Sequence, residues 1–436
     1  MSLVIVSLAF VAGFGAISLA DLDLDEYQGS WFVSIVMLDK IVFTPIGGKM
    51  AEIWGIKKTF LLCSPLIVLG WILLGSGLST FGLFLGRILT GIGTSMLMVS
   101  PNIYIAETVH PSCRATLSSM VGFAYSAGIC LLWMLGYFFT WQVVAYISSM
   151  PALLSFLAFL YLPDSPYWLL KNQRNQQAYE SLKLFRPNET EKEVIEEFNE
   201  MLEHFSQKQS KKVDTFINRI RSPAFVKPMV FMAILYSLYF STGQSTISSY
   251  LQLIMMESKI ELRTETCAII LGVAQLMASI LTFVTIQKLP PKPTFVICAV
   301  IKTASLAGTG AYFLLLKQNP DFSIWSWIPL VMCFLTYSTH AFLVTITWNL
   351  IGEIFPAETR NFAAGITECI GYIVIFAILK SYVIMIKTIG LDGIFFILAG
   401  FGALSAIYGS LSIPDHRNKS LVKIEKNNCK TPLISK

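Results

Sequence analysis

Charged residues, histidines and catalytic motifs are all scarce in this chain of 436 residues. Only 14% of its residues are charged and only four are histidines. The phosphate-binding pattern G-x-x-x-x-G-K-[ST] and the zinc-binding pattern H-E-x-x-H are both missing. No nucleophile is paired with a base in a recognisable pattern, so the sequence predicts neither an enzyme nor a cofactor. A pore-lining repeat or filter loop is also missing, which argues against a channel.

The eight cysteines are scattered along the chain and form no C-x-x-C pair. No cluster of cysteines and histidines has the arrangement of a metal site, so no bound metal is expected. We interpret the cysteines as small residues that face the core or the lipid. Nothing in the sequence indicates a nucleic-acid partner.

Apolar residues, by contrast, are abundant. They make up 54% of the chain, and the mean hydropathy is +0.63, which is too apolar for a soluble globule. About twelve apolar stretches of roughly 20 residues are long enough to cross a hydrocarbon core of about 30 Å as helices. The expected spans lie near residues 1–20, 29–50, 59–77, 82–105, 117–138, 142–162, 226–252, 265–286, 293–316, 325–351, 362–385 and 391–413.

The first apolar stretch, residues 1–20, resembles a signal peptide with a Ser-Leu-Ala cleavage site. It has no basic residues before its apolar region, and its removal would disturb the alternation of charge between loops. We therefore interpret it as the first membrane-spanning helix.

Lysine and arginine collect in loops of one parity. They include Lys57 and Lys58, a dense set between residues 171 and 227, and the lysines of the tail. Residues 21–26, in a loop of the other parity, are acidic. The positive-inside rule then places both termini and the middle segment in the cytoplasm.

A charged motif occurs once in each half of the chain. Glu107 and Arg114 are seven positions apart with a proline between them, and Glu353 and Arg360 repeat this arrangement 246 positions later. Each motif is followed by a second Pro-Asp pair that includes Asp164 or Asp415. The repetition predicts an all-α membrane protein of twelve transmembrane helices in two pseudo-symmetric six-helix halves, an architecture common among secondary transporters.

The domain boundaries follow from this repetition and from the polar middle segment. We expect an N-terminal half, a cytoplasmic linker with short amphipathic helices, a C-terminal half and a cytoplasmic tail. These units comprise residues 1–162, 163–225, 226–413 and 414–436, respectively.

An ordered set of short motifs runs through nearly the whole chain. It comprises residues 29–31, 48–58, 86–91, 104–107, 163–171, 352–356 and 414–421, with Arg114, Trp348, Arg360 and Lys380. With these motifs the chain resembles the sugar porters of the major facilitator superfamily, most closely the facilitated trehalose transporter-like proteins of insects. The resemblance implies a small polyhydroxylated solute, the lipid bilayer as surroundings and a plasma-membrane location. It leaves the oligomeric state open, and a monomer would be adequate.

The resemblance also implies a gating network of charged residues that ties the two halves together on the cytoplasmic side. Each exposed pair contributes under about 1 kcal/mol, but several together can bias an equilibrium between two states. The alternative is a set of ordinary charges at helix ends. The network residues are Glu52, Lys57, Lys58, Arg87, Glu107, Arg114, Asp164, Glu353, Arg360 and Asp415.

Two positions depart from the family pattern in ways that weaken this gate. Ile56 and Tyr167 stand where relatives usually carry arginine, and lysine does not replace the bidentate arginine fork. We therefore expect a shifted balance between inward-open and outward-open states, and a purely outward resting state would contradict this expectation.

The substrate-binding positions depart further. Sugar hydroxyls need side chains that donate and accept hydrogen bonds, together with an aromatic face. Gly122, Phe240 and Gly371 stand where the family has amides. Polar and aromatic candidates nevertheless remain, although Trp348 is equally well explained as a packing residue. The binding candidates are Gln244, Ser245, Gln275, Trp348, Tyr239 and Tyr372.

Four ionisable residues lie inside apolar stretches: Asp39, Lys40, His340 and Glu368. Intramembrane ionisable groups are costly and indicate function by default. Neighbours on a helix point about 100° apart, so Asp39 and Lys40 cannot pair face to face. Hydrogen bonding between helices is the preferred interpretation, and a proton relay is the alternative.

The sequence as a whole predicts a facilitative transporter of a sugar such as trehalose or a hexose, working by alternating access. Residues 12–15 carry no acid where proton-coupled relatives have an aspartate, which favours passive transport. The alternatives are a proton-coupled or non-sugar carrier and a non-transporting sensor or scaffold.

Overall fold

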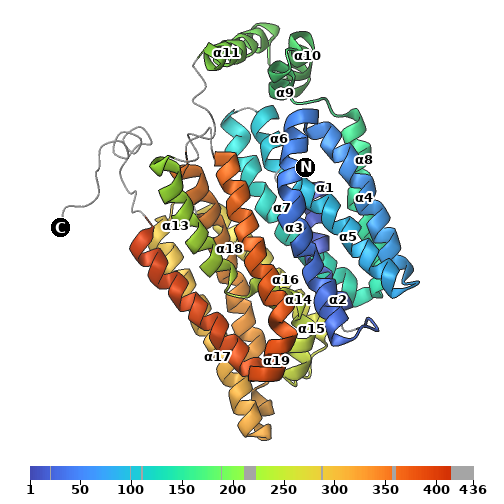
Figure 1. The fold of residues 1–436 in the computed structure, drawn as a ribbon, viewed down its shortest axis with the longest axis vertical. Helices are drawn as coiled ribbons and strands as arrows, with labels where there is room; N and C mark the ends of the chain where they lie inside the picture. The colour runs from blue at the N-terminus through green and yellow to red at the C-terminus, as the bar shows by residue number, and fades with distance from the viewer. Residues whose placement is uncertain are drawn as a thin grey trace, which may run out of the picture.

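The structure, a computed structural model, describes residues 1–413 except 20, 99, 110, 188, 211–221, 286–287 and 356–359. All regular elements in this part of the chain are helices, and most run side by side as one bundle (Figure 1). The first group of helices is α1 (Ser2–Gly13), α2 (Gly15–Ser18), α3 (Glu26–Trp54), α4 (Ile56–Ser76), α5 (Thr80–Leu97), α6 (Ser100–Thr108), α7 (Pro111–Phe138) and α8 (Trp141–Tyr161).

A small helical layer and a second group of helices follow. The layer is α9 (Pro166–Lys171), α10 (Asn175–Phe185) and α11 (Glu191–Ser210). The second group is α13 (Pro223–Phe240), α14 (Gln244–Ser249), α15 (Leu251–Glu257), α16 (Thr264–Thr285), α17 (Pro291–Gln318), the 3-10 helix η1 (Pro320–Trp325), α18 (Ile328–Ile354) and α19 (Arg360–Ser412).

Ten helices in the described part of the chain are long and apolar enough to cross a membrane. The first expected span is divided between α1 and α2, so neither piece reaches the required length. The last two expected spans are merged in α19, whose backbone leaves the helical region at Gly390 with φ 74°. Division of the first span and merging of the last two explain the difference from the twelve spans expected.

Helix ends follow local sequence signals. Asp25 and Gln28 form a capping box at the start of α3, in which the Gln28 backbone N–H donates to the Asp25 carboxylate at 2.7 Å. The same helix ends at Gly55, whose φ of 86° favours glycine. A Cβ at Gly55 would lie 3.1 Å from the Trp168 ring, so glycine also lets α9 pack against this corner.

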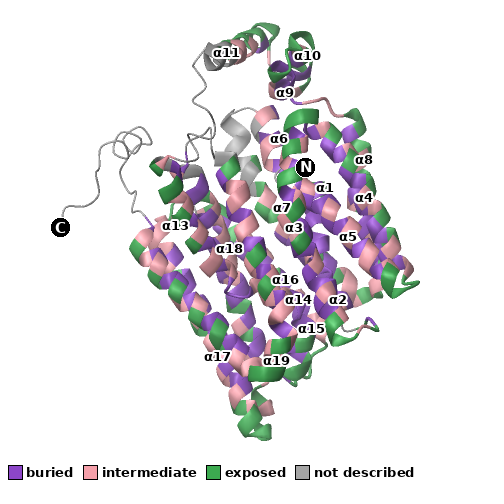
Figure 2. Cartoon of the chain, viewed as in Figure 1, coloured by how far each residue is buried: buried purple, intermediate pink, exposed green. Residues whose placement is uncertain are grey.

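Small residues allow helices in the first group to approach closely. A Cβ on Gly70 of α4 would lie 2.8 Å from the Gly86 carbonyl oxygen of α5, and a Cβ on Gly86 would meet α4 in return. Contact of this kind is typical of helix packing in membranes. Buried residues face the inside of the bundle and exposed ones face outward (Figure 2), where large apolar side chains can meet lipid.

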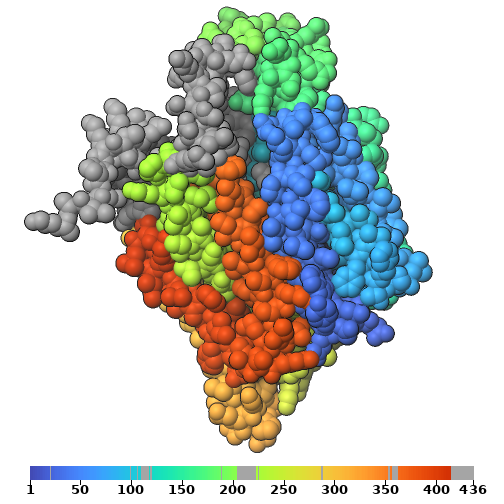
Figure 3. Space-filling view, in the orientation of Figure 1, coloured from blue at the N-terminus to red at the C-terminus, as the bar shows by residue number. Residues whose placement is uncertain are grey.

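The bundle has two ends that are useful as references. We call the end that carries α9, α10 and α11 the linker end, and the opposite end, near α2, α14 and α15, the far end (Figure 1). The two groups of helices meet along two seams, α3 against α19 and α7 against α16. The first seam is visible where the blue and orange helices touch in Figure 3.

Candidate functional site

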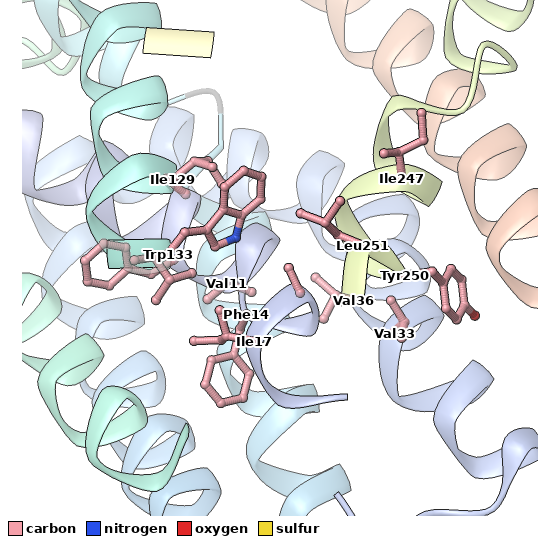
Figure 4. Close-up of a cluster of buried hydrophobic side chains, with 14 of the residues drawn as sticks. Val11, Phe14, Ile17, Val33, Val36, Ile129, Trp133, Ile247, Tyr250 and Leu251 are labelled. Atoms are coloured by element: carbon pink, nitrogen blue, oxygen red, sulfur yellow. The ribbon is translucent and has the colours of Figure 1, made fainter. Parts of the chain in front are cut away.

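Apolar side chains from both groups of helices close the far end. Phe14 and Ile17 from the first group share one core cluster with Ile247 and Leu251 from the second (Figure 4). A Cβ on Gly15 would lie 3.6 Å from the Ser249 carbonyl oxygen, so the two backbones approach closely here. The two groups are therefore packed together at the far end.

Polar contacts extend this closure along the seam between α3 and α19. Glu26 and Lys387 form an exposed ion pair at its outer edge. The Ser30 hydroxyl donates to the Lys380 carbonyl oxygen at 3.2 Å, and Lys380 Nζ lies 4.1 Å from the centre of the Trp31 ring.

The same seam is joined farther toward the middle of the bundle. Lys40 Nζ of α3 lies 5.0 Å from the centre of the Tyr372 ring of α19. The Cys369 thiol, one turn nearer the linker end than Tyr372, lies 3.8 Å from the Ile41 carbonyl oxygen.

The seam between α7 and α16 has a matching pattern. At the far end, the Arg263 guanidinium lies 5.0 Å from the centre of the Tyr137 ring. A Cβ on Gly272 would lie 3.1 Å from Cys130 Cα. Nearer the middle, the Ser126 and Ser279 hydroxyls are 2.6 Å apart. Both seams are thus joined from the far end to about the middle of the bundle.

A polar cluster lies inside the second group, beside the first seam. The Tyr239 hydroxyl is 2.9 Å from His340 Nδ1, and their rings stack with centres 5.4 Å apart. Glu368 lies beside Tyr236 and Tyr372 and interacts electrostatically with Lys40. However, Glu368 Oε1 and the Tyr236 hydroxyl are buried without a bond of hydrogen-bonding geometry.

Lys302 of α17 belongs to the same region, and the sequence interpretation missed it. The residue is fully buried, its Nζ has no hydrogen-bond partner, and this atom lies 5.5 Å from the centre of the Tyr239 ring. A lysine in the middle of the apolar stretch 293–316 was the available signal, because buried ammonium groups in membranes are rare.

Arg87 of α5 joins three helices of the first group. Its Nε donates to the Phe32 carbonyl oxygen at 3.2 Å and its Nη1 to the Val11 carbonyl oxygen at 3.0 Å. The buried Asp39 carboxylate interacts electrostatically with Arg87 and packs against Gly91, which lies on the same helix as Arg87. Adjacent residues Asp39 and Lys40 therefore face different helices, as their helical offset requires.

The other predicted binding residues are spread over several helices. Gln275 of α16 is buried, and its backbone carbonyl oxygen accepts from the Ser279 hydroxyl at 2.9 Å. Gln244 and Ser245 begin α14, and the Gln244 Oε1 atom has no hydrogen-bond partner. Trp348 is half-buried on α18. No recorded hydrogen bond or ring contact joins these four described residues, so their binding role stays a prediction.

Two positions that lack the family amides pack against each other. The Phe240 ring at the end of α13 covers Gly371 of α19, where an added Cβ would overlap ring atoms Cε2 and Cδ2. Gly122 differs, because an added Cβ there would meet no heavy atom within 4 Å.

At the linker end, Glu52 connects α3 to the small helical layer. Its carboxylate pairs with Lys49 at 3.1 Å and with Lys171 of α9 at 3.0 Å. The Trp168 indole donates to the Glu52 carbonyl oxygen at 3.1 Å. Lys57 donates to the Leu160 carbonyl oxygen at 3.2 Å, whereas Lys58 is exposed.

The remaining network residues are described only in part. Burial raises the pKa of the Glu107 carboxyl, while Ser165 and Lys171 act in the opposite direction. The Asp164 carbonyl oxygen accepts from Ser181 at 2.5 Å. The structure does not describe the side chains of Arg114, Glu353 and Arg360. Asp415 lies wholly outside the described residues. A contact across the two halves by these charges stays a prediction.

Arg186, which the sequence interpretation did not single out, ties α10 to α11 and to the end of α6. Its Nε and Nη2 bind the two Glu197 carboxylate oxygens at 2.8 and 2.7 Å, and its Nη1 donates to the Thr108 carbonyl oxygen at 3.0 Å. A bidentate pair of this kind fixes orientation as well as distance. Its burial depends on tertiary packing, which a surface-like sequence does not reveal.

Comparison with known proteins places these features in a family context. The family described as "Sugar (and other) transporter" matches residues 2–427. The facilitated trehalose transporter Tret1 of Culex quinquefasciatus is 24% identical over 421 residues, which cover 94% of this chain and 80% of that protein. Facilitated glucose transporter member 6 of solute carrier family 2, from Mus musculus, is 24% identical and covers 93% and 83%, respectively.

Solved structures show the same fold. The inward-open conformation of the xylose transporter XylE from E. coli matches with a TM-score of 0.77 and 20% sequence identity, covering 98% of both chains. A crystal structure of the D-xylose-proton symporter matches with a TM-score of 0.72 and 19% identity, covering 96% of this chain and 98% of that one.

Proposed function

This chain belongs to the sugar (and other) transporter family, and from that premise we propose that it carries a sugar such as trehalose or a hexose passively across the membrane. The inferred resemblance to the sugar porters and the expected twelve-helix fold are both confirmed. The family match over residues 2–427 is the observation that carries the proposal. The chain is therefore a multi-pass membrane transporter and not an enzyme.

The two seams support alternating access as the mechanism. Both are joined from the far end to about the middle, at Ile41 with Cys369 and at Ser126 with Ser279. Rocking the halves apart at the far end would separate the apolar contacts that Phe14 and Ile17 make with the second group. The Glu26–Lys387 pair would oppose this movement little, because it is exposed and such pairs contribute little. Residues 1–162 and 226–413 are proposed to move as the two bodies.

Orientation and location are part of the same proposal. The linker end carries many lysines and arginines, which supports a cytoplasmic position for this end and for both termini. We propose the plasma membrane as its location, as the resemblance to the sugar porters implies. The charged network at the linker end is proposed to hold the halves together when the far end is open.

Passive transport is the preferred mode because the first span contains no acidic residue. The buried carboxyls of Asp39 and Glu368 provide a specific reason to consider proton coupling as a second candidate. Proton coupling would require at least one of these carboxyls to change protonation during transport.

Uptake of labelled trehalose and glucose by cells that express the protein tests the function. Surface abundance is measured in parallel, and the proton gradient is either present or collapsed. Saturable uptake that ignores the gradient supports a passive sugar carrier, whereas uptake that falls with the gradient supports coupling. Absence of uptake despite normal surface abundance contradicts the sugar proposal and calls for other solutes.

A further inference from the structure

Two buried, oppositely charged side chains lie near the middle of the α3–α19 seam. Lys40 comes from the first group of helices and Glu368 from the second, and they are 9% and 4% exposed. They interact electrostatically, but no ion pair joins them, and Lys40 Nζ lies over the Tyr372 ring instead. The two charges therefore lie close to each other without direct contact.

Such an arrangement is costly unless something else contacts both groups. Burial of an ionised group without partners in a membrane protein is strongly unfavourable, so opposite charges normally pair directly. Here the Tyr236 and Tyr372 hydroxyls lie beside the Glu368 carboxylate, but Glu368 Oε1 and the Tyr236 hydroxyl make no hydrogen bond of good geometry. The region thus presents a buried carboxylate, two tyrosine hydroxyls and a nearby ammonium group.

Lys40 is directed to this region by its position on α3. Its neighbour Asp39 packs against Gly91 within the first group, whereas Lys40 points to the seam with α19. Glu368 and Tyr372 lie four residues apart on α19, so they share one face of that helix. The Cys369–Ile41 contact shows that the two helices are close at this level.

The chemistry of the three side chains matches a pair of adjacent hydroxyls. A carboxylate accepts two hydrogen bonds from a vicinal diol, and an ammonium group donates to hydroxyl oxygens. Tyr372 and Tyr236 add an aromatic face and a further hydroxyl.

We propose that Lys40 and Glu368 bind adjacent hydroxyls of the transported solute, with one contact from each group of helices. This proposal rests on the proposed sugar transport and names the residues and the substrate feature that it uses. Solute binding then joins the two halves at the middle of the seam and replaces the missing direct ion pair. Specificity follows from the diol, so a solute that lacks one of these hydroxyls binds more weakly.

The test uses the full-length protein purified in detergent, with binding of trehalose, glucose and singly deoxygenated glucoses measured by calorimetry. We expect Glu368→Gln and Lys40→Met each to weaken binding by about tenfold or more, because hydrogen bonds to charged groups are lost. Removal of the contacted hydroxyl should weaken binding to the wild type but make little further difference in these variants. Glu26→Gln, the same acid-to-amide change at the exposed end of this seam, is the matched control and should retain the wild-type pattern.

The outcomes separate this proposal from the proposed function. If the wild type binds or transports no sugar, the proposed function fails and this inference fails with it. If the wild type binds sugar but both variants bind equally well with the same deoxy-sugar pattern, only this inference is overturned. A charge exchange, Lys40→Glu with Glu368→Lys, that restores wild-type affinity would indicate a structural pair and would also overturn it. Should Glu368→Gln fail to fold, Lys40→Met and Glu368→Asp carry the same comparison.

Discussion

The ring of Phe240 lies directly over Gly371, and it fits there because Gly371 has no side chain. The contact joins the end of α13 to α19 inside the second group of helices. The resemblance to the sugar porters predicts amides at both positions, and here the shapes of the two residues complement each other. Part of the space expected for sugar-binding side chains is therefore filled by an aromatic ring.

Gly371→Ala is expected to destabilise the protein, because the new methyl group would overlap the Phe240 ring. Overpacking of this kind costs about 1–3 kcal/mol. Thermal unfolding in detergent measures the effect. Phe240→Leu should relieve the overlap, so the double variant should be more stable than the sum of the two single changes predicts. Additive effects would show that the two positions do not interact.

A bulky residue at Gly272 is expected to force the α7–α16 seam apart. A Cβ there would already lie 3.1 Å from Cys130 Cα, so Gly272→Leu cannot fit without movement of one helix. Cys130, which is 4% exposed, should then react with a membrane-impermeant maleimide, and sugar uptake should fall. Peptide mapping by mass spectrometry identifies the labelled cysteine.

Gly122→Leu is the matched control, because no heavy atom lies within 4 Å of an added Cβ at this position. It should leave the reactivity of Cys130 unchanged. Equal protection of Cys130 in both variants would contradict the proposal that this seam closes the far end.

The spans were predictable from the sequence because length and apolarity are local properties of a membrane helix. Breaks within spans were harder to see. Gly243, with φ 78°, interrupts the expected span 226–252 before α14, and Gly390, with φ 74°, breaks the helical backbone inside α19. A glycine permits such a conformation, but tertiary packing determines where the chain uses it.

The candidate site was predictable only as a set of residue types. His340 and Glu368 were recognised because ionisable groups in apolar stretches are conspicuous, whereas Tyr239 and Tyr372 were recognised through the family resemblance. Their grouping around one seam depends on how α3, α13, α18 and α19 pack, which no local pattern specifies. Lys302 escaped notice although its sequence signal was of the same kind.

Arg87→Lys is expected to destabilise the first group of helices. The guanidinium donates to the carbonyl oxygens of Val11 and Phe32 and lies 5.1 Å from the centre of the Phe32 ring. A lysine cannot reproduce this planar fork, and loss of one hydrogen bond from a buried charged group costs about 1.5–3 kcal/mol. Arg263→Lys, at an exposed arginine, should lower the unfolding temperature far less. Equal decreases would mean that Arg87 does not join the three helices.

Lys302→Met is expected to stabilise the protein. The Lys302 ammonium is fully buried without a hydrogen-bond partner, and its contact with the Tyr239 ring offsets only part of the desolvation cost. Methionine keeps a similar length without a polar group, so the free energy of unfolding should rise by about 1 kcal/mol or more. Lys317→Met, at an exposed lysine on the same helix, should change the unfolding temperature little. A marked loss of stability in Lys302→Met would instead show that the ammonium stabilises the polar cluster, and its contact with the Tyr239 ring would then be the next to test.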